Sequence, residues 1–280
     1  MADANSTSAR ASVLGLFETL YEASWLPDSV LTPALENMYG GGLALEEPRV
    51  YANFVSTLDG VVAIPSVPRS NELISMGSEG DKFVMGLLRA LADIVLTGAG
   101  TVAAWPRASW MPERAYPPAA GEFAELRRAL KKDAQPEVAI LSGNGAIDPA
   151  HPALEAGALV LTSEEGAARL SARLPQASQL VSLGVDRELD PAAVVAHLRE
   201  RGHQHVLCEA GPHGFGSFVR AGVVDELFLT ISPLLAGRSR QGDRFGLVEG
   251  AAFLPENGVR ARVSSVKRHD AHLFLRYALR

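Results

Sequence analysis

Residues 93–102 read DIVLTGAGTV, an apolar run that ends in two glycines and a threonine. The apolar residues predict a buried strand, and the glycines allow the backbone to turn sharply into a helix. Residues 205–218, HVLCEAGPHGFGSF, repeat this order, with Gly211, Gly214 and Gly216 after the apolar run. Because open α/β sheets bind ligands at the carboxyl ends of their parallel strands, the two segments predict a ligand-binding edge.

The glycine spacing does not match the common dinucleotide-binding motif. Neither segment has the full Gly-x-Gly-x-x-Gly pattern followed by an acidic residue at the expected distance. For either segment alone, glycines that only permit close packing of strand and helix are an equally good explanation. Two such segments in one chain favour two phosphate contacts or one elongated cofactor.

Outward from these segments, β-rich runs alternate with helical patterns, which indicates an α/β fold with a mostly parallel sheet flanked by helices. Strands are expected at 50–56, 93–98, 137–143, 158–163, 179–183 and 205–211, and helices at 81–92, 120–134, 163–174, 190–202 and 214–222. Three further β runs at 225–235, 259–269 and 272–279 have no helical pattern between them. They predict an antiparallel edge at the C-terminal end of the sheet.

The N-terminal part has a different pattern. Val13, Leu14, Phe17 and Leu20 have helical spacing, which predicts a helix over 11–23. Prolines and a Gly-Gly-Gly run then break any regular element before residue 48. We therefore expect a helical extension and linker over 1–47, without chemistry of its own, and one domain over 48–280.

Composition excludes several classes of protein. The 280 residues carry a net charge of −6, which disfavours nucleic-acid binding. The single cysteine, Cys208, allows no intrachain disulfide and no zinc cluster of the deaminase type, and favours a reducing cytoplasm. The histidine pairs lack the spacing of metal ligands, so we expect no metal. No apolar run approaches the roughly 18 residues of a membrane span, so we expect a cytoplasmic protein without a membrane partner.

Four motifs together resemble one family. They are NFVSTLDG at 53–60, LLRALADIVLTGAGTV at 87–102, CEAGPHGFGSFVRAGVVDEL at 208–227 and ISPLLAG at 231–237. In sequence and spacing they resemble the reductase domain of the riboflavin-pathway deaminase–reductase family. The resemblance covers about residues 49–280 and implies a dihydrofolate reductase-like fold, a homodimer, and NADPH-dependent reduction of a ribosylamino-pyrimidine phosphate. With one cysteine and no zinc cluster, we expect no deaminase domain.

The resemblance also implies a set of cofactor-binding residues at the glycine segments and on the neighbouring strands. Ser142 has an equally good explanation as a turn serine before Gly143. Thr162 and Ser163 are further candidates from spacing alone. The residues that the resemblance assigns to NADPH are Asn53, Gly98, Gly100, Thr101, Ser142, Gly211, Pro212, His213, Gly214 and Phe215.

Five residues are implied at the catalytic and substrate site. Glu209 and Asp59 are the catalytic candidates, although a loop-capping carboxylate and an ordinary Asp-Gly turn are the respective alternatives. Ser75, Arg89 and Trp105 are expected at the substrate with Glu209, and for Arg89 a salt bridge across the fold is the alternative.

One position departs from the family pattern and leaves the substrate open. Trp105 stands where an aspartate-rich stretch is usual, and its indole can stack on a flat ring or fill a pocket wall. A dihydrofolate or pterin reductase of the same fold is therefore a second interpretation. A non-catalytic nucleotide-binding protein is a third.

Overall fold

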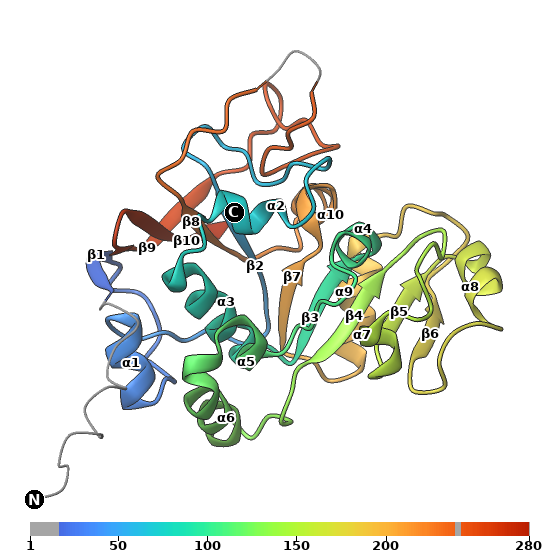
Figure 1. Ribbon diagram of the computed structural model, residues 1–280, viewed down its shortest axis with the longest axis horizontal. Coiled ribbons are helices and arrows are strands. Elements are labelled where there is room, and N and C mark those ends of the chain that lie inside the picture. The colour runs from blue at the N-terminus through green and yellow to red at the C-terminus, as the bar shows by residue number, and fades with distance from the viewer. Residues whose placement is uncertain (1–16, 239–241, 280) are drawn as a thin grey trace, which may run out of the picture.

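A computed structural model describes residues 17–238 and 242–279. Within them, ten strands form one sheet in the order β1-β9-β10-β8-β2-β7-β3-β4-β5-β6, as Figure 1 shows. The pairs from β8 through β2, β7, β3, β4 and β5 to β6 are parallel, whereas β10, β9 and β1 extend the sheet antiparallel. The strands are β1 (Glu18–Glu22), β2 (Arg49–Ser56), β3 (Ile94–Gly98), β4 (Glu137–Leu141), β5 (Leu159–Thr162), β6 (Gln179–Ser182), β7 (His205–Glu209), β8 (Glu226–Ile231), β9 (Ala261–His269) and β10 (His272–Leu279).

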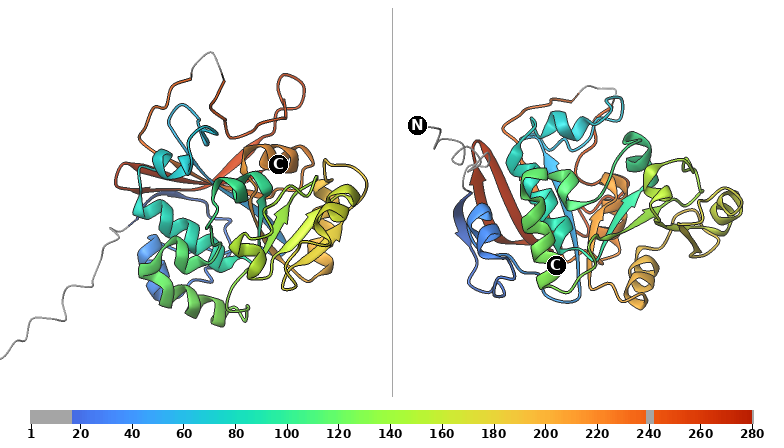
Figure 2. Two further views of the ribbon diagram at one scale, coloured as in Figure 1. Left: turned by 45° about the vertical axis from the view of Figure 1, so that its right-hand side comes forward. Right: turned by 60° about the horizontal axis from the view of Figure 1, so that its bottom comes forward.

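Helices cover both faces of the sheet, with α3, α5 and α6 on one face and α9 and α10 on the other (Figures 1 and 2). The expected sheet, mostly parallel with an antiparallel C-terminal edge and flanked by helices, is confirmed. The helices are α1 (Pro33–Tyr39), α2 (Ser70–Ile74), α3 (Glu79–Leu91), α4 (Ala99–Ala104), α5 (Pro112–Ala115), α6 (Ala120–Ala129), α7 (Pro152–Glu155), α8 (Glu164–Leu170), α9 (Pro191–Glu200) and α10 (Gly211–Arg220), with a 3₁₀ turn at Pro117–Ala119.

The segment before residue 48 differs from the expectation. The predicted helix over 11–23 is wrong at Glu18–Glu22, which form β1 and pair with β9, and residues 11–16 lie outside the described residues. The spacing of apolar residues predicted a helix incorrectly here. The side chains of β1 are all exposed, so the strand has no alternation of buried apolar and exposed polar residues that would identify it.

The prolines of this segment also do not prevent regular structure. Pro33 occupies the first turn of α1, where its missing N–H costs no hydrogen bond, and the Thr32 hydroxyl accepts from the Leu35 N–H. Gly40 ends α1 with a φ of 67°, a conformation that glycine adopts without strain. Leu35 and Tyr39 are buried in the same core as α3, so the segment packs against the rest of the chain. The division at residue 48 stays a prediction.

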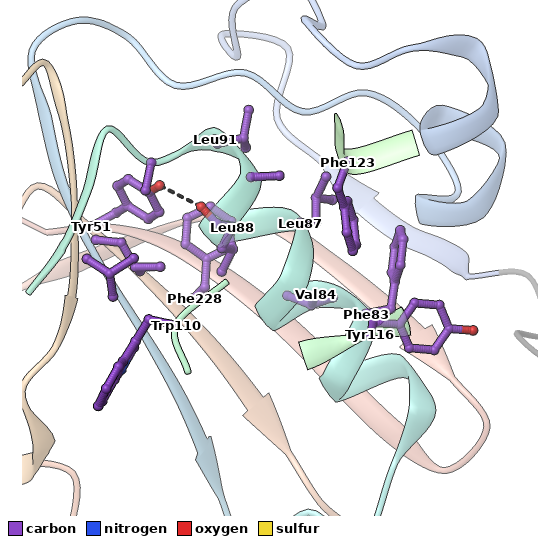
Figure 3. Close-up of a cluster of buried hydrophobic side chains, with 14 of the residues drawn as sticks. Tyr51, Phe83, Val84, Leu87, Leu88, Leu91, Trp110, Tyr116, Phe123 and Phe228 are labelled. Atoms are coloured by element: carbon purple, nitrogen blue, oxygen red, sulfur yellow. Dashed lines mark hydrogen bonds between the residues drawn. The ribbon is translucent and has the colours of Figure 1, made fainter. Parts of the chain in front are cut away.

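The core on the α3 face is rich in aromatic side chains, as Figure 3 shows. Phe83 packs edge-on against Tyr116 and stacks with Phe123 of α6, with ring centroids 5.7 and 6.1 Å apart. The Tyr51 hydroxyl of β2 donates to the Leu88 carbonyl at 2.8 Å (Figure 3). These contacts fix α3 against the middle of the sheet, with Asp81 of its first turn beside Thr230, near the carboxyl end of β8.

Two long segments run together above that end of the sheet, residues 57–70 and residues 242–260 (Figures 1 and 2). An isolated β-bridge joins Ala63 to Phe245, with backbone hydrogen bonds of 2.9 Å from Val62 N to Phe245 O and from Phe245 N to Ala63 O. We call residues 244–250 the strap. It connects the segment after β2 to the start of α10, because the Glu249 N–H donates to the Pro212 carbonyl.

Candidate active site

The two glycine segments lie side by side. β3 and β7 are parallel neighbours, with Thr97 opposite Glu209 in the register. A Cβ atom added at Gly98 would lie 3.1 Å from the Ala210 carbonyl oxygen, and one at Gly211 would lie 3.5 Å from the Thr101 hydroxyl. The expected glycine loops are largely the first turns of helices, since α4 begins at Ala99 and α10 at Gly211. The sheet thus brings two helix starts to one place.

The starts of these two helices have no side-chain cap. Neither Gly98 before α4 nor Ala210 before α10 offers a capping oxygen, whereas Ser78 caps α3 and Asp190 caps α9. Unpaired N–H groups and the helix dipole favour an anion at such a position. A Cβ at Gly100 would meet no atom within 4 Å, so the α4 backbone faces open space. These features fit the pyrophosphate of a nicotinamide cofactor.

The remaining candidates of the second glycine segment have different surroundings. The Pro212 carbonyl is bonded to the strap, and the His213 ring lies edge-on to Phe245 with centroids 5.0 Å apart. Gly214 lies close to the preceding turn, since a Cβ there would come within 2.6 Å of the Ala210 Cβ. Phe215 differs most from its expected role, because its side chain is buried against Phe54 in the core on the α10 face. The Phe215 side chain therefore packs α10 against the core.

The serines and threonine at the ends of β4 and β5 are mostly engaged within the protein. Thr162 donates to the Ser142 carbonyl at 2.5 Å. Ser163 donates to the Gly143 carbonyl at 2.6 Å and caps α8 by accepting from Gly166 N. The Ser142 hydroxyl is buried and has no hydrogen-bond partner within the described residues. Of the three, Ser142 therefore fits best as a donor to a ligand.

Glu209 and Arg89 bind each other. The Arg89 Nε and Nη2 atoms donate to the two Glu209 carboxylate oxygens at 3.1 and 2.7 Å, and Nη1 donates to the Ser109 carbonyl at 3.3 Å. Their side chains are only 9% and 11% exposed. The salt bridge considered for Arg89 is therefore present, and its partner is the residue expected to bind the substrate. Together the two side chains form a buried ion pair without net charge at the end of β7.

The Asp59 carboxylate joins two loop segments through hydrogen bonds. It accepts hydrogen bonds from the Thr57 hydroxyl at 2.6 Å and from the backbone N–H groups of Ala236 and Gly237 at 3.0 and 2.7 Å. These bonds, the one from Thr57 first, lower the pKa of the Asp59 carboxyl to about 2. Asp59 is thus an ionised group that ties the turn after β2 to the segment after β8.

The two other substrate candidates lie at the α2 and α4 ends. Ser75 is buried, and its hydroxyl donates to the Glu72 carbonyl at 3.2 Å. This hydrogen bond within the protein explains how a polar side chain is tolerated there. Trp105, at the end of α4, is partly buried, and the Arg69 guanidinium lies 5.7 Å from its ring centroid. The His151 Nε2 atom donates to the Trp105 carbonyl at 3.0 Å. The Trp105 backbone is therefore held by His151, and its indole has a cation beside it.

Asn53 and an unexpected residue complete the site. Asn53, on β2, lines a cavity of about 10 Å³ together with Thr230, Val84 and Arg276. Asp81, in the first turn of α3, is 9% exposed, and its carboxyl lies beside the Thr230 side chain of β8. A usable signal for its burial is present in the sequence, because Asp81, Val84 and Leu88 have the spacing of one helix face. A carboxyl on an otherwise apolar face is unusual and points to a specific partner or role.

Two further features concern the described residues only. They contain no cluster of three or more histidine, cysteine, aspartate or glutamate side chains that could hold a metal ion. No helix formed by residues 17–238 or 242–279 has the length and apolar character that crossing a bilayer requires.

The fold and the site define an α/β protein with uncapped helix starts at neighbouring parallel strands and a buried ion pair beside them. Residues 48–269 match the model of the RibD C-terminal domain family. The chain belongs to this family. The family resemblance and the dihydrofolate reductase-like α/β fold expected with it are confirmed.

Solved structures share the fold at low sequence identity. A pyrimidine reductase-like protein of Corynebacterium diphtheriae is 21% identical with a TM-score of 0.63, covering 83% of this chain and 92% of its own. RibD of Acinetobacter baumannii is 20% identical with a TM-score of 0.62, and the match covers 84% of this chain and 58% of RibD. The riboflavin biosynthesis reductase Rib7 of Saccharomyces cerevisiae is 16% identical with a TM-score of 0.59, covering 90% and 96%. A search of curated proteins finds no match.

Proposed function

We propose that this protein is an NADPH-dependent reductase that transfers hydride to a ribosylamino-pyrimidine phosphate, as the 5-amino-6-(5-phosphoribosylamino)uracil reductases of riboflavin biosynthesis do. The observation that carries the proposal is the pair of uncapped helix starts at the ends of β3 and β7, directly beside the Arg89–Glu209 pair. Membership of the RibD C-terminal domain family supports it. So do the names of similar structures, which include a pyrimidine reductase-like protein and a riboflavin biosynthesis reductase.

In this proposal the first turns of α4 and α10 hold the cofactor pyrophosphate through their N–H groups, with Gly100 leaving room for it. The Ser142 hydroxyl donates to a phosphate or ribose oxygen on the adenosine side. When bound, the cofactor supplies the hydride, and the protein supplies orientation and a dry polar environment. Glu209 and Arg89 present acceptors and donors to the pyrimidine ring, with Trp105 at one side.

A glycine pair tests the cofactor site. Gly100→Leu puts a side chain into the open space at α4, whereas Gly121→Leu does the same on α6, where an added Cβ also meets no atom within 4 Å. Both helices should stay folded. We expect the NADPH dissociation constant, measured by calorimetry, to rise at least tenfold for Gly100→Leu and to stay unchanged for Gly121→Leu. Equal affinities would contradict the proposed cofactor site.

The substrate is tested by following NADPH oxidation with the ribosylamino-pyrimidine phosphate and with dihydrofolate. Turnover of the pyrimidine is the expected result. Turnover of dihydrofolate alone would favour the pterin reductase, for which the partly buried indole of Trp105, with the Arg69 cation beside it, is the supporting observation. Tight NADPH binding without turnover of either compound would favour a nucleotide-binding protein. The proposal further places the protein in the cytoplasm as a homodimer, in line with the family resemblance.

A further inference from the structure

Arg69 and Trp105 form a cation–π pair beside the candidate site. Arg69 directly precedes α2 and Trp105 directly follows α4, and both helices lie at the carboxyl ends of the parallel strands (Figure 1). The Arg69 guanidinium lies 5.7 Å from the indole centroid, within the distance at which an aromatic face attracts a cation. One face of the indole is therefore covered by a cation and is not available to a flat ring.

The turn that follows α4 connects this indole to the buried ion pair of the site. The Arg89 guanidinium, which binds Glu209, also donates to the Ser109 carbonyl at 3.3 Å. In the same turn the Ala108 N–H donates to the Trp105 carbonyl at 2.9 Å. Contacts thus run from the buried ion pair through this turn to the indole, and from the indole to the exposed cation beside it.

The two arginines at the ends of this line of contacts are held with different strength. Arg89 is 9% exposed and donates two hydrogen bonds to the Glu209 carboxylate. The Arg69 side chain is 60% exposed, and it lies 3.5 Å from the Glu72 carboxylate, whose side chain is 51% exposed. An exposed ion pair of this kind contributes little free energy, so an anion of higher charge can displace Glu72 from Arg69.

The backbone at Arg69 has an unusual conformation that its surroundings hold in place. Its φ is 54°, in the left-handed region that side-chain-bearing residues rarely adopt. The Ile64 N–H donates to the buried Ser70 hydroxyl at 3.0 Å, and the Glu72 N–H donates to the Arg69 carbonyl at 3.0 Å. Such conformations persist where the neighbouring structure enforces them, and they are frequent at ligand-binding positions. The start of the Arg69 side chain is therefore fixed by the loop.

We infer that Arg69 binds the terminal phosphate of the substrate and thereby selects phosphorylated over unphosphorylated ribosylamines. This inference rests on the proposed function. In its ring-opened form the proposed substrate is a chain with a polar heterocycle at one end and a phosphate at the other. The line of contacts has the matching order, because it begins at a buried ion pair and ends at an exposed guanidinium. A guanidinium donates two parallel hydrogen bonds to a phosphate, which then takes the place of the Glu72 carboxylate.

The role of Arg69 is tested by kinetics with Arg69→Asn. Asparagine tolerates a positive φ, so the loop should keep its conformation while the cation is lost. We expect the KM for the ribosylamino-pyrimidine phosphate to rise about 10- to 100-fold, with kcat little changed. The KM for the same compound without its phosphate should not change. Arg69→Lys should give an intermediate KM, because it keeps the charge and loses the paired donors. Equal changes in KM for both compounds would overturn the inference.

Two matched variants separate phosphate binding from general attraction by positive charge. Arg107 is an exposed arginine two residues after Trp105, and within residues 17–238 and 242–279 it has no ion pair or ring contact. Arg107→Ala removes the same charge and should leave the KM at the wild-type value. Glu72→Gln frees Arg69 from its competing carboxylate and should lower the KM by up to about fivefold. If Arg107→Ala raises the KM as much as Arg69→Asn does, the inference is wrong.

Ribose 5-phosphate gives a test that needs no turnover. Its titration should change the intrinsic fluorescence of the wild type, because phosphate binding moves the guanidinium that lies beside the Trp105 indole. Trp105→Phe should remove this change, and ribose without phosphate should not produce it. Arg69→Asn should weaken the binding of ribose 5-phosphate about tenfold or more.

The outcomes distinguish this inference from the proposed function. A wild type that reduces no ribosylamino-pyrimidine but binds ribose 5-phosphate through Arg69 would overturn the proposed function and support the phosphate site. An enzyme that reduces the pyrimidine with the same KM in the wild type and in Arg69→Asn would support the function and overturn the phosphate site. A wild type that binds ribose and ribose 5-phosphate equally, or neither of them, would also overturn the phosphate site.

Discussion

The Arg89–Glu209 pair gives a sharp test of how the site is held together. Arg89→Met keeps most of the side-chain volume on α3 but removes both hydrogen bonds to the Glu209 carboxylate and the one to the Ser109 carbonyl. Glu209 is then left with a charge at 11% exposure and no cation beside it. Breaking a buried pair in this way typically costs about 3–5 kcal/mol, because the remaining charge stays desolvated. For a chain of this size, roughly 2–4 °C are lost per kcal/mol, so the Tm should fall by roughly 6–20 °C.

The assay is urea unfolding followed by far-UV circular dichroism, with Arg89→Met, Glu209→Leu and the double variant. The double variant should recover most of the loss, because replacing both charges by apolar side chains removes the unpaired charge. A loss below about 1 kcal/mol for Arg89→Met would mean that the pair is open to water. A double variant as unstable as the single ones would refute the reasoning as well, since the cost would then come from lost packing.

Two further predictions concern single side chains. Because the folded-state pKa of Asp59 is lowered to about 2, below its ordinary value of 3.8, this carboxylate stabilises the fold above that ordinary value. The stability difference between the wild type and Asp59→Asn should therefore be constant above about pH 5 and shrink as pH falls through 3.8 and then through about 2. Urea titrations at several pH values would measure it, and a pH-independent difference would contradict the reasoning. Burial raises the pKa of the Cys208 thiol to about 11, so the native protein at pH 8 should not react with a thiol reagent until it unfolds, and rapid labelling of folded protein would show that β7 opens.

Sequence patterns predicted the central sheet because its strands are short apolar runs bounded by glycine and polar residues. The same patterns failed at β1, whose side chains are all exposed, and at the short helices α2, α5 and α7, which bury few side chains and so have no clear helical period. The meeting of the two glycine segments follows from β3 and β7 being neighbours, which the order of elements along the chain does not reveal.

The site was predicted only where a motif pointed to it. Arg89 and Glu209 were both expected at the substrate, but their mutual ion pair depends on how α3 crosses the end of β7. The burial of Asp81 was not predicted, because an acidic residue in the first turn of a helix is ordinary and only its place on the buried face makes it unusual. Phe215 was expected at the cofactor because it lies in the glycine segment that resembles a cofactor-binding loop of the family, yet this segment is helical and the Phe215 side chain points to Phe54 in the core.

The family match begins at residue 48, but the physical core does not. Lys267 of β9 is 1% exposed, and its ammonium group donates to the Thr19 hydroxyl and the Gly40 carbonyl while lying 4.6 Å from the Tyr39 ring centroid. All three partners precede residue 48. Without them this lysine would lose its hydrogen bonds, and the core that α3 shares with Leu35 and Tyr39 would lose those two side chains. A piece starting at residue 48 would therefore contain every residue proposed for chemistry and lack part of the surface that keeps α3, and with it Asp81 and Arg89, in place.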